Sequence, residues 1–262
     1  MKLIRMLKLL ISSPKEFILK VKSKITDTLD WLKYSQNEKL LQQEKMYKAL
    51  GFDRPKAIAK LRKLSLPDKE QHILFSAISL HSKISSILEI GTFNGSSSKV
   101  LSSLFPEAKI LTIDLHDEDP LFISTYRRSG DQARKQFISE RNNLLKSCPN
   151  VTFEQKNSLC LSLDVFEFDL IWVDGAHGYP VVTADIINAL RLAKNQGWIL
   201  CDDMFMGLQN SDSYYKSNAT YETIAALEYA GLVKYSKVYK RLNFQSSGRR
   251  SCSEFICVAS KV

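Results

Sequence analysis

The stretch Ile87-Leu88-Glu89-Ile90-Gly91-Thr92-Phe93-Asn94-Gly95-Ser96-Ser97-Ser98 decides the fold of this chain. Leu88 and Ile90 have the apolar, β-favouring character of a buried strand. Gly91 permits a tight turn and Gly95 opens a helix, because glycine adopts backbone angles that other residues avoid. A strand that turns into a helix in this way presents free backbone N–H groups, so the stretch predicts a nucleotide-cofactor site.

The glycine spacing differs from the G-x-G-x-x-G pattern of dinucleotide binding. Glu89 stands two residues before Gly91, and no third glycine follows at the required place. An E-x-G-x-x-x-G turn suits a cofactor without a pyrophosphate, and its carboxylate can bind an amino group directly or through water. Asn94 and the serines after Gly95 can cap the first helical turn.

This run resembles the first motif of class I S-adenosylmethionine-dependent methyltransferases, and the resemblance extends over residues 66–262. It implies an α/β, Rossmann-like, doubly wound sheet of seven strands, mostly parallel with a C-terminal antiparallel hairpin. The hairpin strands are expected at residues 233–244 and 254–260. The resemblance also implies S-adenosylmethionine as the cofactor. The cofactor-binding residues expected from motif and position are Glu89, Gly91, Thr92, Phe93, Gly95, Ser96, Asp114, Asn157, Ser158 and Asp174.

Two further segments support a nucleotide site. Residues 109–114 predict a short buried strand ending in Asp114, whose carboxylate can accept both ribose hydroxyls. The alternative is a helix-capping or solvated aspartate beside the acidic run 117–119. Asn157 and Ser158 follow a third predicted strand, where relatives of the family hold the adenine, although both residue types are also common in loops.

Two more buried strands end in acidic residues. Residues 168–174 form an almost unbroken apolar run, typical of a strand buried on both faces of a parallel sheet, and end in Asp174. Residues 198–201 form another such strand, directly before Asp202 and Asp203. Ligands of open α/β sheets bind outside the carboxyl ends of the strands, so we expect these acidic residues to converge on the cofactor site.

Three neighbouring carboxylates without a counter-charge would raise at least one pKa, and a divalent cation would remove the conflict. Oxygen ligands suit Mg²⁺, with Mn²⁺ or Ca²⁺ as substitutes. The arrangement resembles the metal triad of the catechol O-methyltransferase type and of related bacterial small-molecule O-methyltransferases. The predicted metal ligands are Asp174, Asp202 and Asp203. Those families often have Asn or Glu at the last two positions.

His177 is the predicted catalytic base, with Asp174 as its catalytic partner. The catechol type uses a lysine near this point, whereas the D-G-x-H sequence fits the bacterial subgroup. Histidine needs little tuning to accept a hydroxyl proton near neutral pH. The structural alternative is that His177 caps the following helix or hydrogen-bonds Asp202.

Three functions are therefore compatible with the sequence. The first is a metal-assisted O-methyltransferase of a small hydroxylated molecule such as a sugar, glycan precursor or secondary metabolite. The second is a metal-independent N- or O-methyltransferase. The third is a non-catalytic scaffold that retains the cofactor fold. The complete set of motifs from Glu89 to Asp203 argues against the third.

The net charge is unevenly distributed along the 262 residues. Residues 1–63 hold 16 lysines and arginines against 6 acidic residues, and the remainder holds 21 against 22. We expect a basic amphipathic arm at 1–35, a helical cap or dimerisation region at 36–65, and the methyltransferase domain at 66–262. A homo-oligomer is expected. Residues 1–24 can lie on an anionic membrane surface, form a dimerisation arm or remain a tail.

Other broad classes are disfavoured. The arm has no cleavage site and no long uncharged apolar run, so neither a signal peptide nor a membrane span is indicated. It also lacks an aromatic stacking surface, which argues against nucleic acid as a partner. Five cysteines without paired metal spacing predict reduced thiols in a cytoplasmic protein, with peripheral contact at the inner membrane surface through the arm as an option. Residues 115–130 and 204–219 are the expected substrate loops.

Overall fold

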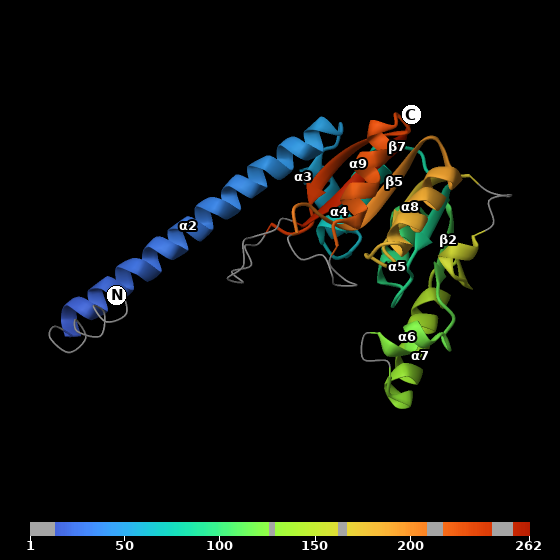
Figure 1. Cartoon of the computed structure of the whole chain (residues 1–262), viewed down its shortest axis with the longest axis horizontal. Coiled ribbons are helices and arrows are strands. Elements are labelled where there is room, and N and C mark those ends of the chain that lie inside the picture. The colour runs from blue at the N-terminus through green and yellow to red at the C-terminus, as the bar shows by residue number, and fades with distance from the viewer. Residues whose placement is uncertain (1–13, 126–128, 162–166, 209–216, 243–253) are drawn as a thin grey trace.

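A seven-stranded sheet with helices on both faces forms the body of the protein in the computed structural model (Figure 1). The structure describes residues 14–125, 129–161, 167–208, 217–242 and 254–262. The strand order is β3-β2-β1-β4-β5-β7-β6, and the mostly parallel seven-stranded sheet with a C-terminal antiparallel hairpin is as the resemblance implies. The strands are β1 (Ser86–Ile90), β2 (Lys109–Asp114), β3 (Val151–Gln155), β4 (Phe168–Val173), β5 (Ala193–Phe205), β6 (Val233–Tyr239) and β7 (Glu254–Lys261).

The first five strands are parallel, and β7 runs antiparallel between β5 and β6. The order reverses between β1 and β4, where the chain crosses from one half of the sheet to the other. Side chains of β1 alternate between the two faces: Ile87 packs on one face, and Leu88 and Ile90 pack on the other. This alternation places two separate hydrophobic layers against one sheet.

Helices cover both layers. On the face of Ile87 lie α3 (Arg54–Lys63), α4 (Glu70–His81) and α5 (Ser96–Leu104), and on the opposite face lie α8 (Val181–Leu192) and α9 (Ala219–Tyr229). The remaining short and peripheral helices are α6 (Pro120–Ser124), α7 (Asp131–Lys146) and the 3₁₀ turn η1 (Ser158–Cys160). Burial on both faces explains why the central strands are continuous apolar runs.

The structure corrects the expected start and end of the fifth strand. β5 begins at Ala193 and continues to Phe205, beyond the expected range 198–201. Asp202 and Asp203 therefore lie inside the strand, past its last pairing with β4, and Asp203 has φ +49 at an irregularity in the β5–β7 register. Met204 and Phe205 are buried, so the expected substrate loop does not begin at residue 204.

A long helix, α2 (Pro14–Ala49), projects from the body of the molecule (Figure 1). It runs without interruption across the boundary expected at residue 35. Its C-terminal part is fixed to β6, because the Gln43 side chain accepts a hydrogen bond from N–H of Tyr239 (2.7 Å) and donates one to its C=O (2.9 Å). Tyr47 belongs to the same hydrophobic cluster as the strands, so residues 36–65 contribute to the core of the methyltransferase fold.

The outer part of α2 exposes several large apolar side chains, namely those of Ile18, Leu19, Ile25 and Leu29. Residues 1–13 lie outside the described residues, so contact of residues 1–24 with a membrane or a second copy stays a prediction. None of the described helices combines the length and apolar character needed to cross a bilayer.

Candidate active site

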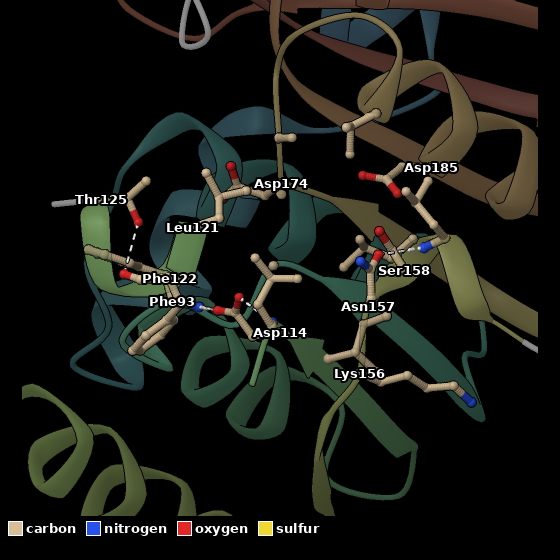
Figure 2. A pocket seen from close by; sticks show the side chains of 18 of the residues that line it. Phe93, Asp114, Leu121, Phe122, Thr125, Lys156, Asn157, Ser158, Asp174 and Asp185 are labelled. Carbon is tan, nitrogen blue, oxygen red and sulfur yellow. Dashed lines mark hydrogen bonds between the residues drawn. The ribbon is translucent and has the colours of Figure 1, made fainter. Parts of the chain in front are cut away.

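A cavity of about 390 Å³ opens at the carboxyl ends of β1, β2 and β4 (Figure 2). This is the switch point of the strand order, where open α/β sheets bind their ligands. Its volume lies within the usual range of ligand sites, roughly 300–1,000 Å³. Of the residues expected at the site, those that line the cavity are Gly91, Phe93, Asp114, Asn157, Ser158, Asp174 and His177.

Gly91 brings the ends of β1 and β4 together. Its φ is +102, and a Cβ at this position would lie 2.3 Å from the backbone oxygen of Asp174. Gly95 has a different role: its φ is +79, and an added Cβ would meet Leu145 of α7 at 3.1 Å. Only Gly91 lines the cavity, and Gly95 serves helix entry and packing. The N-cap of α5 is Gly95, and Asn94, the residue before it, accepts a hydrogen bond from N–H of Ser96 (3.1 Å).

Asp114 is at the end of β2, on the cavity wall. One carboxylate oxygen accepts a hydrogen bond from N–H of Phe93 (2.7 Å), and the other accepts one from N–H of Leu115 (2.8 Å). These bonds fix the carboxylate across the turns that follow β1 and β2. A carboxylate at this position can bind ribose hydroxyls in nucleotide-binding folds, and for Asp114 that role stays a prediction.

Glu89 lies behind the cavity wall. It is fully buried, and one of its oxygens accepts hydrogen bonds from the hydroxyls of Thr112 (2.7 Å) and Ser98. Burial raises the pKa of Glu89 to about 7. Its second oxygen has no partner among the described residues. Thr92, Gly95 and Ser96 also lie outside the cavity lining, and their contact with a cofactor stays a prediction.

Asn157 and Ser158 occupy another part of the cavity wall, beside Asp185 of α8 (Figure 2). Asp185 is 1% exposed, and neither of its carboxylate oxygens has a hydrogen-bond partner among the described residues. The pKa of Asp185 is raised to about 6 by burial. The nearby Ser158 side chain lowers the pKa, but by less than burial raises it. A buried polar group without a partner is costly, so a ligand donor fits this position. Sequence analysis did not identify Asp185, because it lies within a helical pattern.

The predicted catalytic residues converge at the edge of the cavity. Nε2 of His177 lies 3.4 Å from a carboxylate oxygen of Asp203 and 3.9 Å from one of Asp174. The pairing of Val173 with Cys201 brings Asp174 beside Asp202, as the parallel register predicts. The alternative in which His177 hydrogen-bonds Asp202 is not what the structure contains.

A lysine completes this cluster. The Lys240 ammonium lies 2.7 Å from a carboxylate oxygen of Asp202, contacts Asp203, and is 3.3 Å from Glu254. Burial alone would lower the pKa of Lys240, but the charges of Asp202 and Asp203 outweigh it and hold the pKa above its usual value. Sequence analysis missed Lys240 and Glu254, since both lie far along the chain in the edge hairpin.

The pKa values of the carboxylates in this cluster are shifted in opposite directions. Burial raises the pKa of Asp174, and the neighbouring Asp202 raises it further. Burial also raises the pKa of Asp203, but a hydrogen bond with Glu254 and the charges of His177 and Lys240 hold it below its usual value. Asp203 is therefore the ionised partner beside His177, and the pKa of Asp174 is shifted in the opposite direction.

The predicted metal ligands do not fit a divalent cation in this arrangement. Mg²⁺ requires oxygen ligands at about 2.0–2.1 Å and usually retains several waters, whereas the Lys240 ammonium already occupies the space between Asp202 and Asp203. Within the described ranges, no group of three or more His, Cys, Asp or Glu side chains is arranged to hold a metal ion.

The loop after β2 is fixed to the cavity by a buried arginine. Arg141 of α7 is fully buried, and its guanidinium donates to both oxygens of Asp117 at 2.7 and 2.8 Å. The same guanidinium packs over Phe153 and Phe122, and Phe122 lines the cavity. Asp117 is therefore paired and not merely solvated. Residues 126–128, expected to contact substrate, lie outside the described residues.

A known protein family matches the part of the chain that forms this site. Residues 88–204 match a family model described as a methyltransferase domain. That range includes the turn after β1, Asp114, and the carboxylates that follow β4 and β5. No curated protein matches the chain in sequence.

Solved structures share the fold. A putative O-methyltransferase from Klebsiella pneumoniae is 17% identical, with a TM-score of 0.53, and the match covers 86% of this chain and 98% of that one. The O-methyltransferase TomG from Streptomyces achromogenes, solved with S-adenosylmethionine, is 19% identical over 84% of this chain and 98% of its own, with a TM-score of 0.46. From its domain and fold, the chain is a class I S-adenosylmethionine-dependent methyltransferase.

Proposed function

We propose that this methyltransferase transfers a methyl group from S-adenosylmethionine to a hydroxyl of a small molecule, with His177 as the base. The observation that carries the proposal is the position of His177, which lines the cavity and lies 3.4 Å from Asp203. An imidazole held against an ionised carboxylate is the usual arrangement of a general base.

The cavity wall offers suitable partners for each part of the cofactor. Asp114 can accept hydrogen bonds from the ribose hydroxyls. The carboxylate of Asp185, which has no hydrogen-bond partner among the described residues, can accept one from the amino group of the adenine. Gly91 lets the backbone of the first turn lie close to Asp174, near the expected position of the transferred methyl group. When bound, S-adenosylmethionine supplies a methyl group on a sulfonium, which is already a good leaving group.

The chain's own residues position the acceptor and remove its proton. His177 accepts the hydroxyl proton, and the imidazolium that results lies beside the ionised Asp203, which stabilises it. General-base help is typically worth about 10²–10⁴-fold, whereas orientation of the reactants can contribute roughly 7–11 kcal/mol. Positioning should therefore account for most of the rate enhancement.

The size of the cavity supports a small acceptor. About 390 Å³ must hold parts of both the cofactor and the acceptor. Simple phenols, sugars and comparable metabolites fit such a space, whereas a folded protein would have to present an extended segment. A metal-independent N-methyltransferase is the second candidate, because His177 on the cavity wall can take a proton from an amine as well as from a hydroxyl.

Calorimetry and turnover assays test the proposal. The full chain is titrated with S-adenosylhomocysteine, and turnover is then measured with radiolabelled S-adenosylmethionine on simple phenols, methyl glycosides and amines of matched shape. We expect cofactor binding and label transfer to hydroxyl oxygen. Absence of binding to well-folded protein would disprove the methyltransferase site, and transfer only to amines would select the N-methyltransferase.

A further inference from the structure

We propose that Lys240 is a built-in cation of the active site, which stands where a divalent metal was expected and positions Asp203 against His177. The inference deepens the proposed function and rests on it for the role of His177. Lys240 is 13% exposed at its side chain, and its ammonium donates hydrogen bonds to Asp202 and Asp203 and forms an ion pair with Glu254. An ammonium has three donors and no acceptor, so a cluster of carboxylates is a suitable environment for it.

The fold fixes the position of this lysine on two sides. Lys240 directly follows β6, and its backbone N–H donates to C=O of Glu254 at the start of β7 (2.9 Å). Tyr239, the residue before it, is hydrogen-bonded through both backbone groups to Gln43 of α2. Three elements from distant parts of the sequence therefore hold the ammonium at this edge of the sheet.

Asp203 links the lysine to the base. One of its carboxylate oxygens contacts the Lys240 ammonium, and the other faces Nε2 of His177 at 3.4 Å. Asp203 also has a left-handed backbone conformation, with φ +49, at the register irregularity of β5. Such a conformation is strained for a residue other than glycine and persists only where neighbouring contacts stabilise it. Lys240 is thus a positioning residue that acts on His177 through Asp203.

A lysine and a divalent cation exclude each other here. The ammonium lies 2.7 Å from one oxygen of Asp202 and contacts one oxygen of Asp203, so its positive charge stands between the two carboxylates that a metal would have to join. Removal of its charge would leave the carboxylates of Asp174, Asp202, Asp203 and Glu254 as a cluster without a central cation. Clustered carboxylates of this kind attract a hard divalent cation. The natural protein should therefore ignore Mn²⁺, and the lysine variant should bind it once the freed carboxylates turn toward the position that the ammonium has left.

Electron paramagnetic resonance of Mn²⁺ tests this without any substrate. The full chain, Lys240→Ala and the control Lys194→Ala are each titrated with Mn²⁺. Lys194 also forms an ion pair, with Asp169 at 2.8 Å, but at the opposite end of the strands. We expect Lys240→Ala to bind one Mn²⁺ at least about tenfold more tightly than the other two proteins, a gain of about 1.4 kcal/mol or more. Asp203→Asn in the Lys240→Ala background should abolish that binding.

Two outcomes would overturn the inference. The first is one tightly bound Mn²⁺ in the natural protein that Asp202→Asn removes, and the second is folded Lys240→Ala that binds no more Mn²⁺ than Lys194→Ala. If Lys240→Ala does not fold, Lys240→Arg is tested in its place, because arginine retains the positive charge. We expect the turnover of this variant, whatever its level, to be unaffected by a chelator. Loss of activity on chelation would contradict the inference even if cofactor binding were normal.

Discussion

The imidazole of His177 lies 3.4 Å from the Asp203 carboxylate, although 25 residues and two elements of the fold separate them along the chain. Asp203 in turn contacts Lys240. The reactive edge of the sheet is therefore an alternating row of imidazole, carboxylate and ammonium. In the proposed function, this row stabilises the proton that the imidazole takes from the acceptor.

Replacement of His177 by alanine should lower turnover by about two orders of magnitude, as expected for loss of a general base. Affinity for S-adenosylhomocysteine should change little, because the proposed cofactor contacts lie on Asp114 and Asp185. Steady-state kinetics and calorimetry measure the two effects. His116→Ala is the control, since His116 does not line the cavity. Unchanged turnover in His177→Ala would assign the imidazole a structural role.

Replacement of Asp114 by asparagine should weaken cofactor binding about 10- to 100-fold. The change removes the negative charge that accepts hydrogen bonds from Phe93 and Leu115 and, in the proposal, from the ribose. Hydrogen bonds to charged groups contribute about 1.5–3 kcal/mol each. Calorimetry with S-adenosylhomocysteine measures the loss, and Glu118→Gln on the same loop serves as the control. Equal affinities in both variants would argue against Asp114 as the ribose ligand.

Asp185 should discriminate between cofactor analogues. The natural protein should bind S-adenosylhomocysteine at least about tenfold more tightly than S-inosylhomocysteine. Only the adenine base has an exocyclic amino group that can donate a hydrogen bond to the Asp185 carboxylate. Asp185→Asn should reduce this ratio towards one, since an amide can donate to the inosine oxygen. Competition binding measures the ratio. An unaltered preference in the variant would remove Asp185 from the adenine site.

Asp185 should also make stability depend on pH. Its pKa in the folded protein is about 6, above the ordinary value of 3.8, so the folded state binds the proton more tightly. This contribution is fully present below about pH 4 and is lost as pH rises through 6, with a maximum of roughly 3 kcal/mol. Urea unfolding at pH 5 and pH 8 measures it. Asp185→Asn should unfold with a smaller difference between the two pH values than the natural chain.

Replacement of Gly91 by alanine should destabilise the fold far more than the same change at Gly231. Both glycines have positive φ, +102 and +73, but only at Gly91 would the new Cβ collide with a backbone oxygen, 2.3 Å away. Gly231→Ala should cost about 1–2 kcal/mol, the usual penalty of a left-handed alanine. Gly91→Ala should cost several kcal/mol more or prevent folding. Urea unfolding compares the two, and equal costs would contradict the close contact of β1 and β4.

Local pattern was sufficient for the positions of the central strands and for several residues of the cavity wall. Apolar runs that end in Gly91, Asp114 and Asp174 predict parallel strands whose carboxyl ends meet, and the structure confirms this arrangement. Boundaries were less accurate: β5 starts five residues before the expected position and includes Asp202 and Asp203. The pairing of β5 with β7 extends the strand, and antiparallel pairing with a distant segment leaves little local signal in the sequence.

The sequence by itself determined the central strands, the turn at Gly91 and a carboxylate-rich edge beside His177, because each strand and its following turn carry their own local signals; the class I fold followed from the resemblance of the first motif. Tertiary structure alone decided what neutralises those carboxylates. Lys240 reaches Asp202 and Asp203 only after β6 and β7 have paired at the sheet edge and Gln43 of α2 has bound Tyr239. Electrostatic compensation depends on distance in space, and no spacing along the chain encodes it.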